Sequence, residues 1–118
     1  MTSANSRKVA DLIGPELDAW VARAEGIEQI AINDGHCVVG VTPNRYVFTP
    51  SMNPAQGQPI MERERIGVAW AQMAGVWYAR PNAWKALPGA RVLQEGPTML
   101  VAGMRAWVWT IYGDEVTA

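Results

Sequence analysis

Cysteine and histidine each occur once in this sequence, as the neighbours Cys37 and His36. One cysteine cannot form an internal disulfide, and one cysteine with one histidine cannot supply the four ligands of a structural zinc site. The pair lies in a segment with strand character, where adjacent side chains point to opposite faces of a sheet. We therefore expect neither a metal site nor a nucleophile and base formed by these two residues.

Charge is also scarce: charged residues make up 18% of the chain, and the formal net charge is -1. A protein without a positive field has little attraction for nucleic acid or for an anionic membrane, so we expect neither as a partner. The chain also lacks the glycine-rich turn that cradles phosphates, and no cofactor is expected.

Long apolar runs are missing as well. The longest uncharged apolar stretch, residues 66–79, is shorter than the roughly 18–20 residues that a membrane-spanning helix needs. The first residues, MTSANSRK, are polar and lack the basic-then-apolar order of a secretory signal. We therefore expect a cytoplasmic protein.

Apolar residues, in contrast, make up 49% of the 118 residues, which is enough for the core of one small domain. We expect a flexible N-terminus over residues 1–8 and a single domain over residues 9–118, because nothing in the polar start offsets the entropy of ordering it. The predicted fold class is α+β. A short antiparallel sheet, made of a β-hairpin and one or two further strands, is expected to pack against an N-terminal and a C-terminal helix.

The N-terminal helix is predicted from its start, its apolar spacing and its end. Pro15 suits the first turn of a helix, and Gly26 supplies a residue that can end it. Between them, apolar side chains recur at the spacing of one helix face, at Leu17, Trp20, Val21 and Ala24.

The C-terminal helix is predicted over residues 98–112, started by Thr98 or Pro97 and ended by Gly113. Arg105 is the only charged residue in this segment, so both of its faces are apolar. Such a helix is either deeply buried or lies at an interface.

Strands are predicted between the two helices. Asp34-Gly35 separates two β-branched runs and predicts a hairpin within residues 28–41, because both central residues of such a turn need positive φ. Residues 45–49 are expected to form a third strand and residues 76–80 a further one. Residues 50–59 and 81–97 contain several prolines and glycines and are predicted to be irregular loops.

Residues 60–66, IMERERI, fit either a short helix or an edge strand. We favour the helix, because Glu, Arg and Met are good helix formers.

Six tryptophans are a large number for a chain of this length. Trp20 and Trp107 fall on apolar helix stripes and are predicted to be core residues. The other four are Trp70, Trp77, Trp84 and Trp109. At least one of these is expected at a pocket or an interface, where Trp and Met are enriched. The predicted interface lies on the last helix and comprises Trp109, Met99 and Arg105.

Three ordered blocks of sequence resemble the NinX-like phage proteins, a small family of unknown function. The blocks span residues 14–26, 51–66 and 96–116. The residues that carry the resemblance are Leu17, Asp18, Trp20, Ala55, Gln56, Gly57, Ile60, Glu62, Arg63, Gly113, Asp114 and Glu115. The resemblance implies a phage or prophage origin and a protein inside the bacterial host cell, and it singles out Gln56-Gly57 as a loop of interest.

Two functions from different classes, and a third that the charge disfavours, are compatible with these features. The first is a non-enzymatic accessory protein that binds a protein partner or itself. The alternative is a small-ligand-binding protein or enzyme with a pocket near the Asn53–Gly57 loop, and single-stranded nucleic-acid binding is the least favoured. No catalytic residue is assigned. The candidate binding residues are Asn53, Gln56, Gly57, Glu62, Arg63, Trp77 and Trp84.

Overall fold

A computed structural model of the chain describes residues 6–82 and 93–117. Its helices are α1 (Gly14–Ala24), α2 (Pro54–Arg63) and α3 (Met99–Tyr112), with a short 3-10 turn, η1, at Val9–Asp11. The strands are β1 (Ser6–Lys8), β2 (Ile30–Asn33), β3 (His36–Val39), β4 (Tyr46–Val47), β5 (Gly67–Ala71), β6 (Val76–Arg80), β7 (Gln94–Gly96) and β8 (Glu115–Thr117). The predicted α+β class is confirmed.

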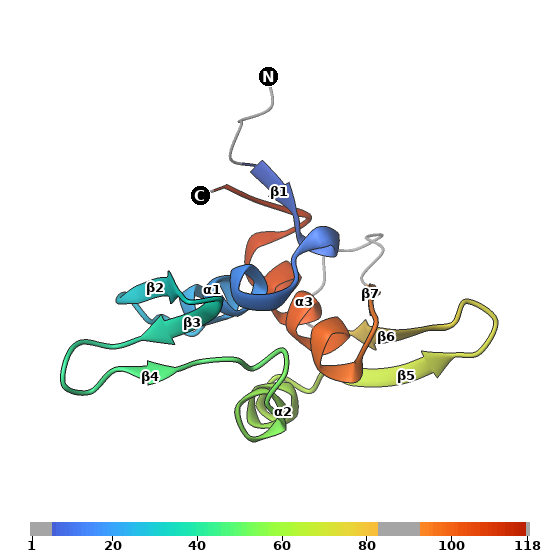
Figure 1. Cartoon of the computed structure of the whole chain (residues 1–118). Helices are drawn as coiled ribbons and strands as arrows, with labels where there is room; N and C mark the ends of the chain where they lie inside the picture. The colour runs from blue at the N-terminus through green and yellow to red at the C-terminus, as the bar shows by residue number, and fades with distance from the viewer. Residues whose placement is uncertain (1–5, 83–92, 118) are drawn as a thin grey trace.

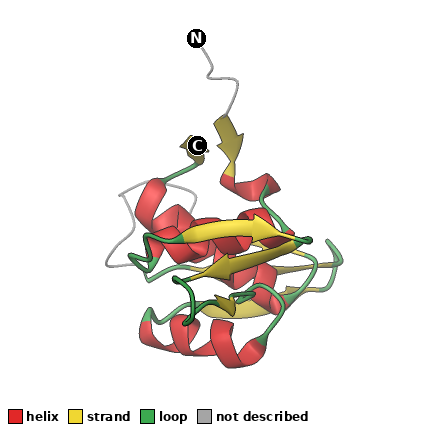
Figure 2. Ribbon diagram, turned by 60° about the vertical axis from the view of Figure 1, so that its left-hand side comes forward, coloured by secondary structure: helices red, strands yellow, loops and turns green. Residues whose placement is uncertain are grey.

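The strands form three small antiparallel sheets, where one sheet was predicted: β1-β8, β2-β3-β4 and β5-β6-β7. Helix α3 lies between the two three-stranded sheets (Figure 1). It contacts α1, α2 and the strands β5, β6 and β7, while β2 and β3 pack against α1. The β1-β8 pair stands at one end of the molecule (Figure 2).

Helix α3 forms where the sequence predicted it and is buried on nearly all sides. The Thr98 side chain accepts a hydrogen bond from the Val101 N–H at 3.1 Å and caps the helix, and Gly113 follows its last residue with a φ of 85°. Residues 101–109 are all buried, Arg105 and Trp109 included. Of the two environments expected for a helix with two apolar faces, the structure has the deeply buried one.

The predictions of the N-terminal helix and of the hairpin are also confirmed. Pro15 lies in the first turn of α1, and Trp20 and Trp107 belong to the core, as predicted. In the hairpin, Asp34 and Gly35 adopt positive φ values of 52° and 77° between β2 and β3. β4 is the predicted third strand, although it is only two residues long.

The prediction of a loop over residues 50–59 is wrong, because α2 begins at Pro54. Proline is well tolerated in the first turn of a helix, where its missing N–H has no partner to lose. The Asn53 side chain accepts a hydrogen bond from the Ala55 N–H at 3.0 Å and caps this start. For residues 60–66, the structure confirms helix over strand as far as Arg63.

Four of the described strands, β1, β5, β7 and β8, were not predicted. β5 precedes the predicted strand β6 and pairs with it, and β7 lies inside the predicted loop 81–97 and pairs with the other side of β6. At the N-terminus, Ser6–Lys8 pairs with β8, within the segment predicted to be flexible. The division into a terminus of residues 1–8 and one domain stays a prediction.

Asp18 ties α1 to the segment that leads into α2. Its carboxylate is buried and accepts a hydrogen bond from the Ser51 N–H at 2.9 Å. Burial raises the pKa of the Asp18 carboxyl, and hydrogen bonding from Ser51 acts in the opposite direction. The contact fixes where α2 begins relative to the core. None of the helices in the described residues is long and apolar enough to cross a membrane.

Candidate functional site

Three of the candidate binding residues are occupied with holding α2 in place. Asn53 caps the helix, and the Gln56 amide joins it to the strand before it: its Oε1 accepts from the Thr49 N–H at 2.7 Å and its Nε2 donates to the Val47 carbonyl at 3.0 Å. Gly57 passes so close to the Pro50 carbonyl oxygen that a Cβ would collide with it. These partners within the chain account for Asn53, Gln56 and Gly57 as structural residues.

Arg63 joins α2 to α1 and α3. Its guanidinium donates to the Glu25 carboxylate, at 2.9 Å from Nη1, and to the Glu64 carboxylate, at 2.8 Å from Nε. The guanidinium also lies 5.5 Å from the ring centre of Trp107, whose indole N–H donates to Glu25 at 3.1 Å. Hydrogen bonds to Glu25 and then to Glu64 raise the pKa of Arg63. Glu62, like Arg63, is exposed.

An apolar groove without a carboxylate in its lining lies beside the start of α2. A hollow of about 370 Å³ lies between the start of α2, β6 and the start of α3, with Pro54, Met61, Trp77 and Met99 among its lining residues. The structure thus brings Trp77 together with Met99, which is 41% exposed. Gln56, Glu62 and Glu64 are not among the lining residues, so the groove offers apolar contact rather than acid and base chemistry.

The predicted interface on α3 is largely inside the protein. Trp109 is 6% exposed, and its indole N–H donates to the Asp114 carboxylate at 2.8 Å. Arg105 is also buried, and its guanidinium donates to the Leu12 carbonyl at 2.8 Å and to the Glu95 carbonyl at 2.7 Å. Burial lowers the pKa of this guanidinium. The sequence predicted that both side chains would contact a partner. In the structure neither is available to one, because α3 is surrounded by the rest of the chain.

The adjacent pair His36 and Cys37 points to opposite faces of β3, as expected. Cys37 is fully buried, while His36 is exposed. Burial raises the pKa of the Cys37 thiol to about 11, which leaves it protonated and a poor nucleophile at neutral pH. In the part of the chain that the structure describes, no group of three His, Cys, Asp or Glu residues could hold a metal ion. Trp84 lies outside the described residues.

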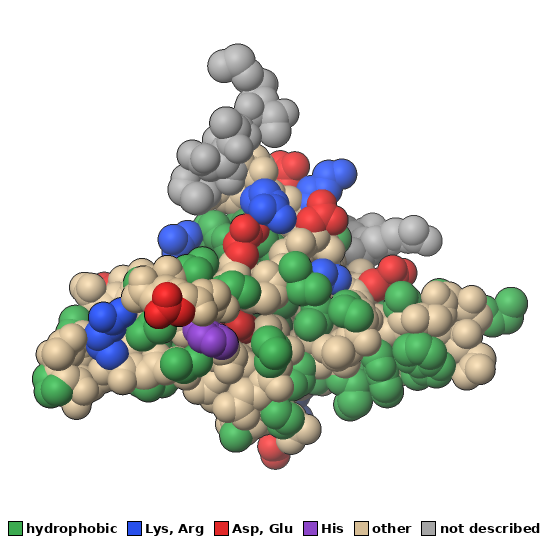
Figure 3. Space-filling model, in the orientation of Figure 1, with side chains coloured by type: hydrophobic (Ala, Val, Ile, Leu, Met, Phe, Trp, Pro, Cys, Tyr) green, Lys and Arg blue, Asp and Glu red, His purple; other side chains and the backbone are tan. Residues whose placement is uncertain are grey.

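The β5–β6 hairpin exposes large apolar side chains, and the predicted site included only Trp77 of this hairpin. Trp70 is 46% exposed, and Met73, in the turn, is fully exposed. The rings of Trp70 and Trp77 contact each other edge to face, with centroids 5.5 Å apart. In Figure 1 the hairpin projects from the body, and in Figure 3 hydrophobic side chains gather over it. The uncharged run of residues 66–79 was the signal in the sequence that could have indicated this surface.

A comparison with known protein families matches residues 8–110 to the family described as Bacteriophage P22, NinX. The chain belongs to this family. The family resemblance predicted from the three sequence blocks is confirmed. Among curated proteins, no match is found.

The residues matched to the NinX family contain most of the described helices and strands. The match includes α1, α2, the β5–β6 hairpin and most of α3. It ends at residue 110, so Gly113, Asp114 and Glu115 lie beyond it. The family description names a phage protein and states no activity.

Proposed function

We propose that this protein is a non-enzymatic phage accessory protein that works by self-association in the cytoplasm of the bacterial host. The observation that carries the proposal is the projecting β5–β6 hairpin, with Trp70 and Met73 exposed and no charged residue from Gly67 to Ala79. Large exposed apolar side chains on a projecting element are typical of protein-binding surfaces.

The strand β5 is an edge strand of its sheet. The order β5-β6-β7 leaves one side of β5 without a neighbour among the described strands. Proteins that stay monomeric usually protect such edges with charged residues or proline, because an open edge pairs readily with another strand. The sequence of β5, Gly-Val-Ala-Trp-Ala, contains neither.

The residues of β5 are also compatible with pairing to a second copy of the same strand. Antiparallel pairing about a two-fold axis at Ala69 would place Ala69 opposite its own copy, Val68 opposite Trp70, and Gly67 opposite Ala71. Small residues then meet small residues on one face, and the two larger apolar residues meet on the other. No like charges oppose each other, so the symmetric arrangement carries no electrostatic cost. We therefore favour a second copy of this chain over another protein as the occupant.

The experiment is a measurement of mass in solution by light scattering, on the wild type and on Ala69→Glu. The side chain of Ala69 points to the face of the sheet opposite Val68 and Trp77, which pack against the core, so the variant is expected to fold. We expect the wild type at twice the mass of the 12.9 kDa chain and Ala69→Glu at the mass of one chain. The matched control is Gln72→Glu, which adds the same charge in the exposed turn of the hairpin and is expected to remain a dimer.

A monomeric wild type at about 100 µM would reject self-association, since functional homodimers are commonly tighter than that. A dimer that Ala69→Glu leaves intact would reject the β5 edge as its interface. If a partner protein, rather than a second copy, protects β5, the hairpin remains the contact surface but our choice of occupant is wrong.

The second candidate function, binding of a small ligand, is supported by the apolar groove between α2 and α3. Its lining of Pro54, Met61, Trp77 and Met99 suits an apolar molecule, not a charged substrate. A fluorescent apolar probe such as anilinonaphthalene sulfonate tests it. Saturable probe binding that Met99→Glu abolishes would favour this function, and no binding by the folded wild type would count against it.

A further inference from the structure

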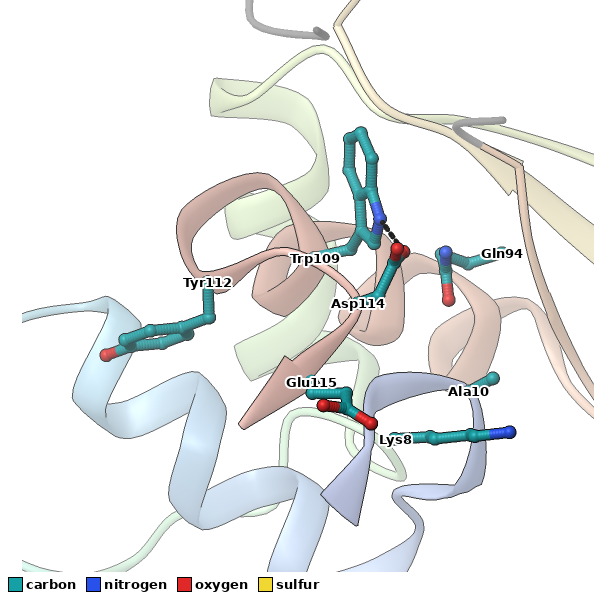
Figure 4. A pocket seen from close by; sticks show the side chains of 7 residues that line it. All are labelled: Lys8, Ala10, Gln94, Trp109, Tyr112, Asp114 and Glu115. Atoms are coloured by element: carbon teal, nitrogen blue, oxygen red, sulfur yellow. Dashed lines mark hydrogen bonds between the residues drawn. The ribbon is translucent and has the colours of Figure 1, made fainter. Parts of the chain in front are cut away.

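A second hollow lies at the other end of α3, away from the hairpin. Its volume is about 710 Å³, and it is bordered by the β1-β8 pair, η1, the end of α3 and β7. The polar side chains that line it include Lys8, Gln94, Asp114 and Glu115. Figure 4 shows them around one hollow, with the Trp109 indole next to the Asp114 carboxylate to which it donates.

Gln94 is the unusual residue of this hollow. The residue is only 8% exposed, and its Oε1 is buried without a hydrogen-bond partner. In Gln56, by comparison, both the oxygen and the nitrogen of the side-chain amide form hydrogen bonds within the chain. A buried carbonyl oxygen without a donor is destabilising, and proteins rarely keep one that serves no purpose. The Gln94 oxygen is therefore an unpaired acceptor on a residue that lines the hollow.

Two carboxylates stand beside this acceptor. Asp114 is held in place because its Oδ1 accepts the Trp109 indole N–H at 2.8 Å, and its second oxygen adds a further acceptor. Glu115 lies in β8 opposite Lys8 in β1. In Figure 4 the Lys8 side chain runs along the rim of the hollow, with its nitrogen turned away from both carboxylates.

We propose that this hollow binds a small organic cation, a guanidinium or a primary ammonium. Such a group supplies several N–H donors on one positive centre, which matches an open carbonyl oxygen beside two carboxylates. An anion would meet two negative groups and one positive group. A metal ion is disfavoured because no group of three His, Cys, Asp or Glu residues among the described residues could hold one.

The proposal assigns each side chain a separate effect. Gln94 Oε1 accepts from the ligand, the carboxylates of Asp114 and Glu115 balance its charge, and Lys8 opposes it as a like charge at the rim. Removing the Lys8 charge should therefore strengthen binding, while removing the Glu115 charge should weaken it. A nonspecific attraction to acidic surface would respond equally to any carboxylate of the protein.

The experiment is a calorimetric titration of the full chain with agmatine, which carries both a guanidinium and an ammonium. Putrescine, with ammonium groups alone, and guanidinium chloride at non-denaturing concentration form two further arms that separate the two chemistries. Urea, which is neutral and similar in shape to guanidinium, is the negative ligand. Calcium chloride tests a metal ion in place of an organic cation.

We expect Gln94→Leu to weaken binding of agmatine by about tenfold or more, as is typical of a lost hydrogen bond to a charged group. The melting temperature of this variant should equal or exceed that of the wild type, because leucine fills the same space without an unpaired oxygen. Lys8→Met should strengthen binding, and Glu115→Gln should weaken it. Glu28→Gln, which removes an exposed carboxylate outside the hollow, is the matched control and should change nothing.

Three results would overturn the proposal. The first is the absence of binding by agmatine, putrescine and guanidinium up to about 10 mM, the range of the weakest specific sites. The second is binding that Gln94→Leu leaves unchanged, or that Glu28→Gln weakens as much as Glu115→Gln does. The third is tight binding of calcium without binding of the organic cations. The dimer of the preceding section is measured separately, so failure of one proposal does not decide the other.

Discussion

Helix α3 and the β5–β6 hairpin are both apolar, rich in Trp and Met and nearly free of charge, yet they lie in opposite environments. α3 is enclosed by α1, α2 and two of the sheets, and its residues 101–109 are all buried. The hairpin is attached to α3 at its base and projects beyond it, which leaves Trp70 and Met73 exposed. Composition alone therefore does not separate a core segment from an interaction surface. What separates them is whether the rest of the chain covers the segment.

The largest expected contrast is between two methionines. Met104 in α3 is fully buried, and Met73 in the hairpin turn is fully exposed. Met104→Ala should lower the free energy of unfolding by about 2–5 kcal/mol, because it leaves a cavity in the core. Met73→Ala should change it by less than about 0.5 kcal/mol. Urea denaturation of both variants measures the difference, and equal losses would contradict the comparison.

Two arginines form the next contrast. Arg105→Met keeps the length of the side chain but leaves the Leu12 and Glu95 carbonyls without their donor, at a cost of about 1–3 kcal/mol. Arg80→Met changes an exposed residue at the base of the hairpin and should be nearly neutral. Thermal melting of both variants tests this, and a tolerant Arg105 would mean that its hydrogen bonds add nothing to stability.

A smaller contrast is expected between two tryptophans. Trp109→Phe removes the hydrogen bond to Asp114 and should cost about 1 kcal/mol of stability. Trp70→Phe should leave the stability of one chain within about 0.5 kcal/mol of the wild type, but it should weaken the proposed dimer. Denaturation measures the first effect, and dilution followed by light scattering measures the second. The reverse pattern would place the interface on α3 after all.

The smallest effect concerns pH and Asp18 in the buried part of the molecule. Burial raises the pKa of this carboxyl in the folded protein, so its proton is held more tightly there than in the unfolded chain. The resulting stabilisation is present below the unfolded pKa of 3.8 and is lost as pH rises through the folded value. Asp18→Asn should therefore be at least as stable as the wild type at pH 7 and lose that advantage in acid. An advantage that grows in acid would reverse the sign of our account.

The sequence predicts the covered part of this fold better than the exposed part. The spacing of Leu17, Trp20 and Val21 and the caps at Thr98 and Gly113 are local signals, and both helices follow them. Helix α2 was missed because Pro54 and Pro59 are typical of loops, whereas the cap at Asn53 and the contact of Ser51 with Asp18 fix a helix there. The latter contact joins residues 33 positions apart and has no local signature.

The candidate site was harder to predict than the fold. Trp109 and Arg105 stood out because they interrupt or flank an apolar stripe, but only the packing of α3 shows that both are covered. The hairpin surface had one visible signal, the lack of charge over residues 66–79. The open acceptor of Gln94 depends on β7, a strand inside a predicted loop, and had no signal at all.

Hydrogen exchange at the β5 amides tests the central claim most directly, because it compares the two regions in one experiment. If β5 pairs with a second copy, the amides of Gly67–Ala71 that face away from β6 exchange slowly at high protein concentration. Dilution or Ala69→Glu should speed their exchange, while α3 stays protected throughout. Exchange at β5 that is fast and independent of concentration would contradict the account.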